Sequence, residues 1–195
     1  MVKNNITVRN LKLTDNLETV AELIYQTDHP YWFENYKNWK DVLVKLIKSK
    51  GSLFYYKNII VAIDDDNIVG IVVAIDEKNA LNYDYSTLIK INKNFEYTIK
   101  NYIIPTSSYI NNNTYISNVC VSENARNRGI GYQLINFVKD KYKNDISLDC
   151  LANNKGALNL YYKCSFKIVE RTKGFSDPNS KNPEVVKLLF ERNLT

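Results

Sequence analysis

The chain has 195 residues and a formal net charge of +5, and 45% of its residues are apolar and 24% charged. Such values are typical of one globular domain, and they exclude disordered, collagen-like and coiled-coil chains. The basic residues are scattered, no apolar run is long enough to span a membrane, and the polar N-terminus does not resemble a signal peptide, so we expect a cytoplasmic protein without a nucleic-acid or membrane partner.

The pattern of apolar residues in the first half predicts a strand, two helices and a β-hairpin, at about residues 6–13, 14–25, 36–49 and 59–75. Thr14 and Asp15 are suited to cap the first helix, and Gly51 follows the second. The polar run 64–67 lies between two apolar runs and predicts the turn of the hairpin. Residues 77–112 are harder to assign, and we expect an insertion that is helical with breaks.

The second half predicts a strand, a helix, a strand, a helix and two strands, at residues 115–121, 130–142, 146–151, 155–164, 166–171 and 185–190. Apolar residues recur at every second position in the strands and along one face of each helix. This order of elements predicts an α/β domain with a mixed central sheet of six to seven strands and helices on both faces.

The most informative segment is the loop between the strand that ends at Val121 and the helix that begins near Ile130. It contains Arg126-Asn-Arg-Gly-Ile-Gly131, with two of the chain's 6 glycines at the start of the helix. Glycine lets the backbone turn sharply and approach a ligand, and the N–H groups that begin a helix attract anions. With arginines beside them, these groups predict a phosphate or pyrophosphate site; the alternative is a turn with solvated arginines.

Two other phosphate-binding loops are excluded by their patterns. A Rossmann loop would need a third glycine where Leu134 stands, and a Walker A loop would need Gly-Lys-Ser/Thr.

Two motifs resemble those of the GNAT superfamily of N-acetyltransferases. Arg126–Gly131 resembles the acetyl-CoA pyrophosphate loop, Q/R-x-x-G-x-G/A. Asn154–Phe166 resembles N-x-x-A-x-x-L/F-Y-x-x-x-G-F, with Ser165 in place of the last glycine, which ends a helix and can be replaced there at a modest cost. The resemblance is close over residues 115–170.

The resemblance implies a single N-acetyltransferase domain over residues 1–195, with the insertion at about 77–112. Its sheet would be mostly antiparallel and would splay between the fourth and fifth strands. The implied activity is transfer of an acetyl group from acetyl-CoA to a primary amine, either a small molecule or a peptide N-terminus.

The resemblance also assigns the cofactor contacts. Backbone groups at the end of the fourth strand would bind the pantetheine, the glycine loop would wrap the pyrophosphate, and an asparagine would bind the cofactor arm. The residues are Val119, Val121, Arg126, Asn127, Arg128, Gly129, Ile130, Gly131 and Asn154.

Tyr161 matches the tyrosine that protonates the leaving thiolate in this family; the alternative is an aromatic residue that only packs. The attacking amine must lose its proton, and an alkyl amine has a pKa of about 10.4, so a base is expected. Asp149 matches the glutamate base of the ribosomal-protein N-terminal acetyltransferases, which this block resembles. Being shorter, it would act through a water, or it is a structural carboxylate. Glu123 is a second candidate for the base.

The acceptor would lie between the loop after the first helix and the loop before the last strand, as is usual in this family. The first loop contains Asp28, Tyr31, Trp32 and Phe33. The three aromatic rings would line a pocket and the carboxylate would attract an ammonium group; alternatively, the rings pack in the core. We expect the insertion 77–112 to cover one side of this site.

The three cysteines, Cys120, Cys150 and Cys164, lack close CxxC spacing and are expected to be reduced, the two on strands as buried small hydrophobes. His29 is the single histidine, so neither a metal site nor a cysteine nucleophile is expected, which favours direct transfer in a ternary complex. The protein would be a monomer or a homodimer. One alternative is a catalytically silent CoA-binding regulatory module. A second alternative, based on the net charge alone, is a protein that binds nucleic acid or a membrane surface.

Overall fold

The central sheet has seven strands. The computed structural model describes residues 6–27, 37–76, 113–173 and 184–192, and the strands follow the order β1-β2-β3-β4-β5-β7-β6 across the sheet. Their bounds are β1 Thr7–Asn10, β2 Ile59–Asp64, β3 Asn67–Asp76, β4 Asn113–Val121, β5 Asp145–Leu151, β6 Lys167–Lys173 and β7 Glu184–Phe190. β4 and β5 are parallel, and the other neighbours are antiparallel. The predicted mixed, mostly antiparallel sheet is confirmed.

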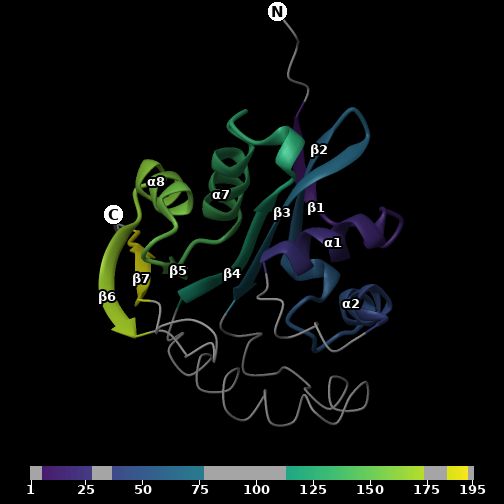
Figure 1. The fold of residues 1–195 in the computed structure, drawn as a ribbon, viewed down its shortest axis with the longest axis horizontal. Coiled ribbons are helices and arrows are strands. Elements are labelled where there is room, and N and C mark those ends of the chain that lie inside the picture. Colours follow the sequence, from purple (N-terminus) through teal and green to yellow (C-terminus); the bar gives the residue numbers. More distant parts are fainter. Residues whose placement is uncertain (1–5, 28–36, 77–112, 174–183, 193–195) are drawn as a thin grey trace, which may run out of the picture.

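Helices cover both faces of this sheet (Figure 1). The described residues form four α-helices, α1 Leu17–Thr27, α2 Trp39–Lys48, α7 Ile130–Lys141 and α8 Lys155–Lys163, and two short 3-10 turns, η2 Tyr56–Asn58 and η4 Glu123–Ala125. α1 and α2 pack on one face, and α7 and α8 on the other. Among these helices, none is long and apolar enough to cross a membrane. The predicted insertion at 77–112 lies outside the described residues.

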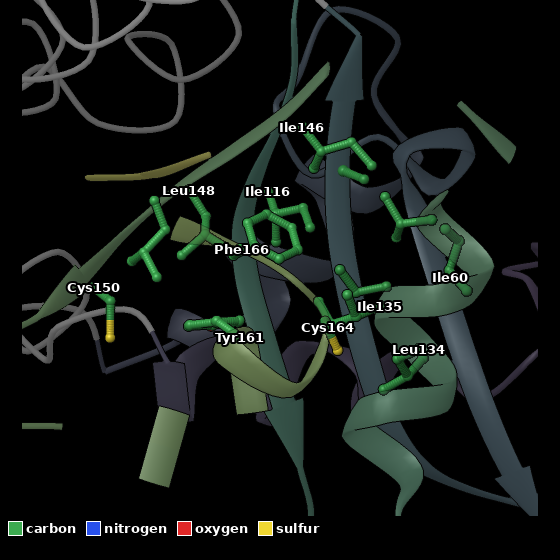
Figure 2. Packing of buried hydrophobic residues seen from close by; sticks show 14 of the residues in the cluster. Ile60, Ile116, Leu134, Ile135, Ile146, Leu148, Cys150, Tyr161, Cys164 and Phe166 are labelled. Carbon is green, nitrogen blue, oxygen red and sulfur yellow. The ribbon is translucent and has the colours of Figure 1, made fainter. Parts of the chain in front are cut away.

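Two hydrophobic clusters hold the layers together, because successive side chains of a strand point to opposite faces. The first cluster joins α1 and α2 to the sheet through residues such as Val61 and Ile71. The second cluster joins α7 and α8 to the sheet and continues across β4, β5 and β7, through Ile116, Leu148 and Leu188 (Figure 2). Each fully buried aliphatic side chain contributes about 1.5–3 kcal/mol of stabilisation. The core on the α7 and α8 face is continuous, because the second cluster includes residues of β2, β3, β4, β5 and β7.

The β2–β3 hairpin turns where the sequence predicts. Asp65 and Asp66 have φ angles of 45° and 65°, and Asp64 pairs with Asn67. Two positive φ angles between paired residues are those of a type I′ turn, whose twist matches that of the strands.

The cap of α1 differs from the prediction, which assigned it to Thr14 and Asp15. Instead, Asn16 Oδ1 accepts a hydrogen bond from the backbone N–H of Thr19 at 3.1 Å. An asparagine oxygen at this position satisfies one of the unpaired N–H groups of the first turn. The prediction was wrong by one to two residues, and the reason lies in the contacts of Asp15.

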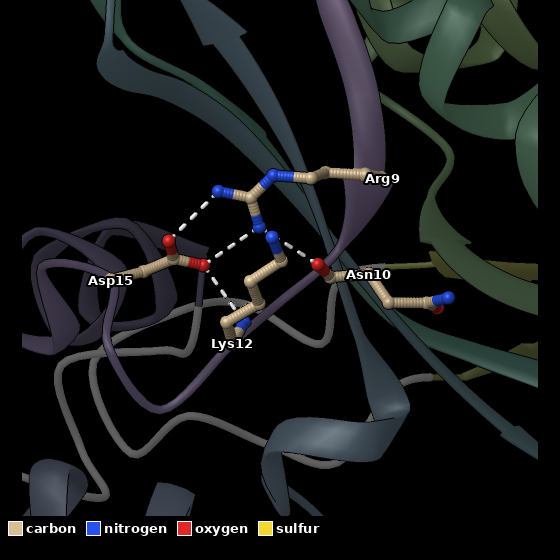
Figure 3. A network of polar contacts seen from close by, with 4 residues as sticks. All are labelled: Arg9, Asn10, Lys12 and Asp15. Atoms are coloured by element: carbon tan, nitrogen blue, oxygen red, sulfur yellow. Dashed lines mark hydrogen bonds and ion pairs between the residues drawn. The ribbon is translucent and has the colours of Figure 1, made fainter.

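Asp15 ties β1 to the segment before α1 (Figure 3). Its two carboxylate oxygens accept hydrogen bonds from Arg9 Nη1 and Nη2, both at 2.8 Å, and Oδ2 also accepts from the backbone N–H of Lys12 at 2.7 Å. Arg9 Nη1 also donates to the backbone oxygen of Asn10. With its oxygens engaged in this way, Asp15 does not cap the helix.

The end of α8 shows how Ser165 fits at the position where the resembled motif has a glycine. Ser165 has a φ of 67°, in the left-handed region that glycine favours. The N–H of Phe166 donates to Tyr161 O and that of Ser165 to Tyr162 O, both at 3.0 Å. These two bonds form a Schellman motif. Ser165 follows the C-cap as expected.

Candidate functional site

β4 and β5 run together for only part of their length. Their pairing extends from Asn113 opposite Asp145 to Ile116 opposite Leu148. Beyond that point β4 continues along β3 to Val121, whereas β5 continues along β7. Two parallel neighbours that part at their C-terminal ends leave an opening in the sheet, and the predicted splay between the fourth and fifth strands is confirmed.

A β-bulge lies where β4 leaves β5. Val73 pairs with Asn118 and Ala74 with Ile116, so Ser117 is the extra residue. A bulge reverses the alternation of side chains beyond it. Val119 accordingly packs against the second cluster. Ser117 was not among the predicted site residues.

Backbone groups of Val119 and Val121 point into this opening. The N–H of Ser122 donates to Val69 O at 2.8 Å. Along an antiparallel pair, residues that exchange hydrogen bonds with the partner strand alternate with residues that do not. Ser122 bonds to β3, so Val121 and Val119, which lie one and three positions before Ser122, turn their N–H and C=O groups away from β3. The backbone groups of both residues therefore lie on the side of β4 that faces away from β3.

The glycine loop has the backbone of an anion site. Asn127 and Gly129 have φ angles of 63° and 77°, and Gly129 is the N-cap of α7. A Cβ added at Gly129 would have no atom within 4 Å, so the space before the helix is open. The helical hydrogen bonds begin with Gln133 N–H to Gly129 O at 3.1 Å. The preceding N–H groups of the first turn have no carbonyl within the helix to bind.

Gly131 has a different role from Gly129. A Cβ at Gly131 would lie 3.0 Å from Cδ2 of Leu160. This glycine therefore allows α7 and α8 to approach closely.

The two arginines of the loop are held differently. Arg126 is exposed, and its Nε donates to Val121 O at 3.1 Å, which keeps the guanidinium at the end of β4. Arg128 Nη1 lies 2.6 Å from Asp64 Oδ2, and this ion pair raises the pKa of Arg128. Arg128 thus fastens the loop to the hairpin.

Asn154 is the N-cap of α8. Its Oδ1 accepts a hydrogen bond from the N–H of Ala157 at 3.1 Å. The oxygen is used by the helix, so a contact with a cofactor would come from the amide NH₂ group.

Tyr161 lies on α8 within the second cluster, and its ring centroid is 6.0 Å from that of Phe166. Burial raises the pKa of its phenol far above the ordinary value, and Cys150 and Cys164 add to this effect. The hydroxyl is therefore protonated near neutral pH and can act as a hydrogen donor. Figure 2 shows Tyr161 beside Cys150 and Leu148 of β5.

Asp149 lies on the opposite face of β5, because Leu148 and Cys150 on either side of it face the second cluster. Asp149 is exposed to solvent, and its Oδ2 accepts a hydrogen bond from the hydroxyl of Tyr115 at 3.0 Å. Protein atoms around the carboxylate desolvate it and raise its pKa; the bond from Tyr115 and the charge of Lys187 lower it. The sheet separates Tyr161 from Asp149, and the opening lies between β4 and β5.

The remaining predicted residues divide into three groups. All three cysteines are free and buried, which confirms the expectation for Cys120 and Cys150, and burial raises the pKa of Cys120 to about 11, so its thiol is not ionised near neutral pH. Glu123 is exposed in η4. The predicted acceptor-loop residues Asp28, His29, Tyr31, Trp32 and Phe33 lie outside the described residues. Among the residues that are described, no group of three or more His, Cys, Asp or Glu side chains could hold a metal.

Tyr115 was missed in the sequence. It was assigned only to a strand, and its contact with Asp149 joins residues 34 positions apart. No local spacing in the sequence predicts such a contact.

The fold resembles that of solved acetyltransferase structures. The most similar solved structures include an N-acetyltransferase from Staphylococcus aureus Mu50, with 18% identity, a TM-score of 0.76 and coverage of 94% of this chain and 100% of that one. The NatC complex bound to Gag peptide and CoA has 16% identity, coverage of 96% and 99% and a TM-score of 0.61. Arabidopsis thaliana NAA60 in complex with acetyl-CoA has 20% identity, coverage of 96% and 98% and a TM-score of 0.59.

Such low identities show the fold alone. No curated protein matches the chain. The model of the acetyltransferase (GNAT) family, however, matches residues 21–166, most of the chain. The chain therefore belongs to the GNAT family of acetyltransferases.

Proposed function

We propose that the protein transfers the acetyl group of acetyl-CoA to a primary amine, by direct attack in a ternary complex. Its family and fold support acetyl transfer from acetyl-CoA in general. The finer proposal rests on one observation: the opening between β4 and β5 has Tyr161 on one face of the sheet and Asp149 on the other. The attacking amine must lose a proton and the departing sulfur must gain one, so two separate proton-transfer groups at the opening suit the reaction.

The residues around the opening fit the cofactor. Gly129 leaves open space before the first turn of α7, where N–H groups and the helix dipole favour a pyrophosphate, with Arg126 beside them. Val119 and Val121 would orient the pantetheine through their backbone groups, and Asn154 would bind the cofactor arm. When bound, acetyl-CoA supplies the activated acetyl group.

We assign Arg128 a modified role. Its side chain pairs with Asp64, so we propose that it contributes to pyrophosphate binding through its backbone and through the position of the loop.

The proton transfers follow from the two environments. Asp149 would accept the proton of the ammonium, directly or through a water; its raised pKa makes it a stronger base than an ordinary carboxylate. Tyr161 would donate its proton to the departing sulfur; burial raises the pKa of its phenol, so the hydroxyl carries that proton near neutral pH until the sulfur takes it. Glu123 lies exposed in η4, before the glycine loop. We assign the role of the base to Asp149, which lies on β5 at the opening.

The acceptor would approach from the face that bears Asp149. On that face the first cluster ends at β4 among the described residues, whereas the strands beyond it carry Asp149, Lys187 and Glu170, whose charges interact. A polar surface of this kind suits an amine in a small molecule or at a peptide N-terminus. The solved NatC complex is an example of this fold with a bound peptide and CoA.

The substitution Tyr161→Phe tests the proposal. Removing the hydroxyl that protonates the sulfur should lower kcat by about 10²-fold or more, with the Kd of acetyl-CoA nearly unchanged. The measurement is thiol release with a panel of amines, together with calorimetric binding of acetyl-CoA.

Tyr162→Phe is the matched control, because Tyr162 is the next residue and is 47% exposed; it should keep wild-type turnover. Equal turnover in the Tyr161→Phe variant and the wild type would contradict the assigned acid. Binding of acetyl-CoA without transfer to any amine would instead favour a silent CoA-binding module.

A further inference from the structure

One side-chain hydrogen bond links β4 to β5 at the opening. The hydroxyl of Tyr115 donates to Asp149 Oδ2 at 3.0 Å. In the register of the two strands, however, Tyr115 lies opposite Ser147 and not opposite Asp149. Its side chain therefore runs diagonally, by two residues along β5, toward the part of the strand that has left β4. The side chain of Tyr115 is long enough to span this diagonal, as its contact with Asp149 shows.

Ser147 lies beneath this diagonal. It is on the same face of β5 as Asp149, two residues before it, and is fully buried. Among the described residues, its hydroxyl is one of two buried side-chain groups that contain an atom without a hydrogen-bond partner. An unpaired buried hydroxyl costs free energy, so hydrogen bonding does not explain this serine. A small side chain at this position leaves room for the ring of Tyr115, which is its partner in the register.

In the described part of the chain, two charged groups of the neighbouring strands act on Asp149. Lys187 of β7 lies directly opposite it, and Glu170 of β6 lies opposite Lys187. The lysine favours the carboxylate form of Asp149 and the glutamate opposes it. Among these described groups Tyr115 is the uncharged donor, and its hydroxyl binds one carboxylate oxygen, Oδ2.

We infer that Tyr115 is a positioning residue that holds the carboxylate of Asp149 at the opening, and that Ser147 provides the space that its ring requires. This inference rests on the proposed function, in which Asp149 is the base. It adds two residues to the acceptor side of the site.

The test compares Tyr115→Phe, Ser147→Ala and Ser147→Val with the wild type. A base acts in its deprotonated form, and the bond from Tyr115 lowers the pKa of Asp149. Loss of the bond in Tyr115→Phe should therefore raise that pKa and move the acid limb of kcat/KM to higher pH, with about a threefold or greater loss of kcat/KM below the limb. Ser147→Val should reproduce this profile by displacing the ring, and Ser147→Ala, which keeps the space, should not. The KM of acetyl-CoA should stay unchanged in all three.

Tyr142→Phe is the matched control. The hydroxyl of Tyr142 donates to Ala74 O at 3.2 Å, so this variant also loses one tyrosine hydrogen bond, but on the other face of the sheet. It should keep the wild-type pH profile. Tyr115→Phe keeps the ring and its packing, and it decides the question even if Ser147→Val does not fold.

A second readout separates this inference from the proposed function. The carboxyl carbon of Asp149, assigned with Asp149→Asn, is titrated by NMR in the wild type and in Tyr115→Phe. A higher pKa in the variant supports the inference, and equal values in both proteins overturn it. Full activity of an Asp149→Asn variant would contradict the proposed base, and it would leave the result of this titration unchanged. A wild-type pH profile in both Tyr115→Phe and Ser147→Val would overturn the positioning role alone.

Discussion

Ser165 follows α8 in a left-handed backbone conformation, which is unfavourable in free energy for a serine. Its φ of 67° places Cβ close to the following carbonyl, which costs about 1 kcal/mol or more for a residue other than glycine. Ser165→Gly should therefore raise the free energy of unfolding by about 0.5–1 kcal/mol, which corresponds to a higher Tm by about 2–4 °C per kcal/mol. Differential scanning calorimetry measures the change.

Ser49→Gly is the comparison for this variant. Ser49 is the C-cap of α2 with a φ of −88°, and its hydroxyl donates to Lys45 O at 2.7 Å. Glycine there gains no conformational advantage and loses a bond, so its Tm should fall. A lower Tm for both variants would show that the strain at Ser165 is not relieved by glycine.

The sequence motifs assign single residues only where the chemistry is local. Gly129 and Tyr161 could be predicted as site residues because the glycine loop and the helix motif are each continuous in the chain, and the structure has them at the start of α7 and on α8. The tether of Arg128 to Asp64 and the bond of Tyr115 to Asp149 could not, since each joins residues that only the folded sheet brings together.

At the scale of elements, the connection from β1 to α1 depends on the paired charges of Arg9 and Asp15. The bidentate pair lowers the pKa of Asp15, chiefly through the hydrogen bonds from Arg9. A carboxyl group with a lowered pKa stabilises the fold fully above its unfolded pKa of about 3.9, and this contribution is lost as the pH falls through the lowered pKa of the folded state.

Asp15→Asn should consequently destabilise the protein by about 1–2 kcal/mol near pH 7. The difference from the wild type should shrink toward pH 3 and below, where the wild-type carboxyl becomes protonated. Urea unfolding at several pH values measures it. A difference that is the same at pH 7 and in acid would mean that the charge of Asp15 contributes nothing.

Elements were predicted more accurately than their details. Helix α7 and strand β5 begin within one residue of their predicted starts, because apolar periodicity and glycine signals both mark them. The bulge at Ser117 was not predicted. Its signal is that the apolar residues Ile116 and Val119 lie three positions apart, which breaks the alternation of a regular strand.

For the whole molecule, the two faces of the sheet differ. The second cluster spans the join of β4 and β5, whereas the first cluster ends at β4 among the described residues. A ligand that binds at the opening contacts both halves of the sheet and should stabilise the domain as one unit.

Thermal unfolding with acetyl-CoA tests this. At about 100 times the Kd, a ligand of the native state adds about 2.7 kcal/mol, which is a rise in Tm of roughly 5–10 °C for a domain of this size. ATP and 3′-dephospho-CoA, measured alongside, should give smaller shifts. An unchanged Tm at millimolar acetyl-CoA would show that the glycine loop does not form a cofactor site.

The strand order has a consequence for synthesis on the ribosome. β7 is the last strand in the chain, yet it lies between β5 and β6. Until residues 184–190 emerge, β6 has no neighbour in the described sheet and one edge of β5 is unpaired, a condition that invites aggregation. The half of the sheet that carries Asp149 is thus completed last, after the strands of the β1–β4 half have emerged.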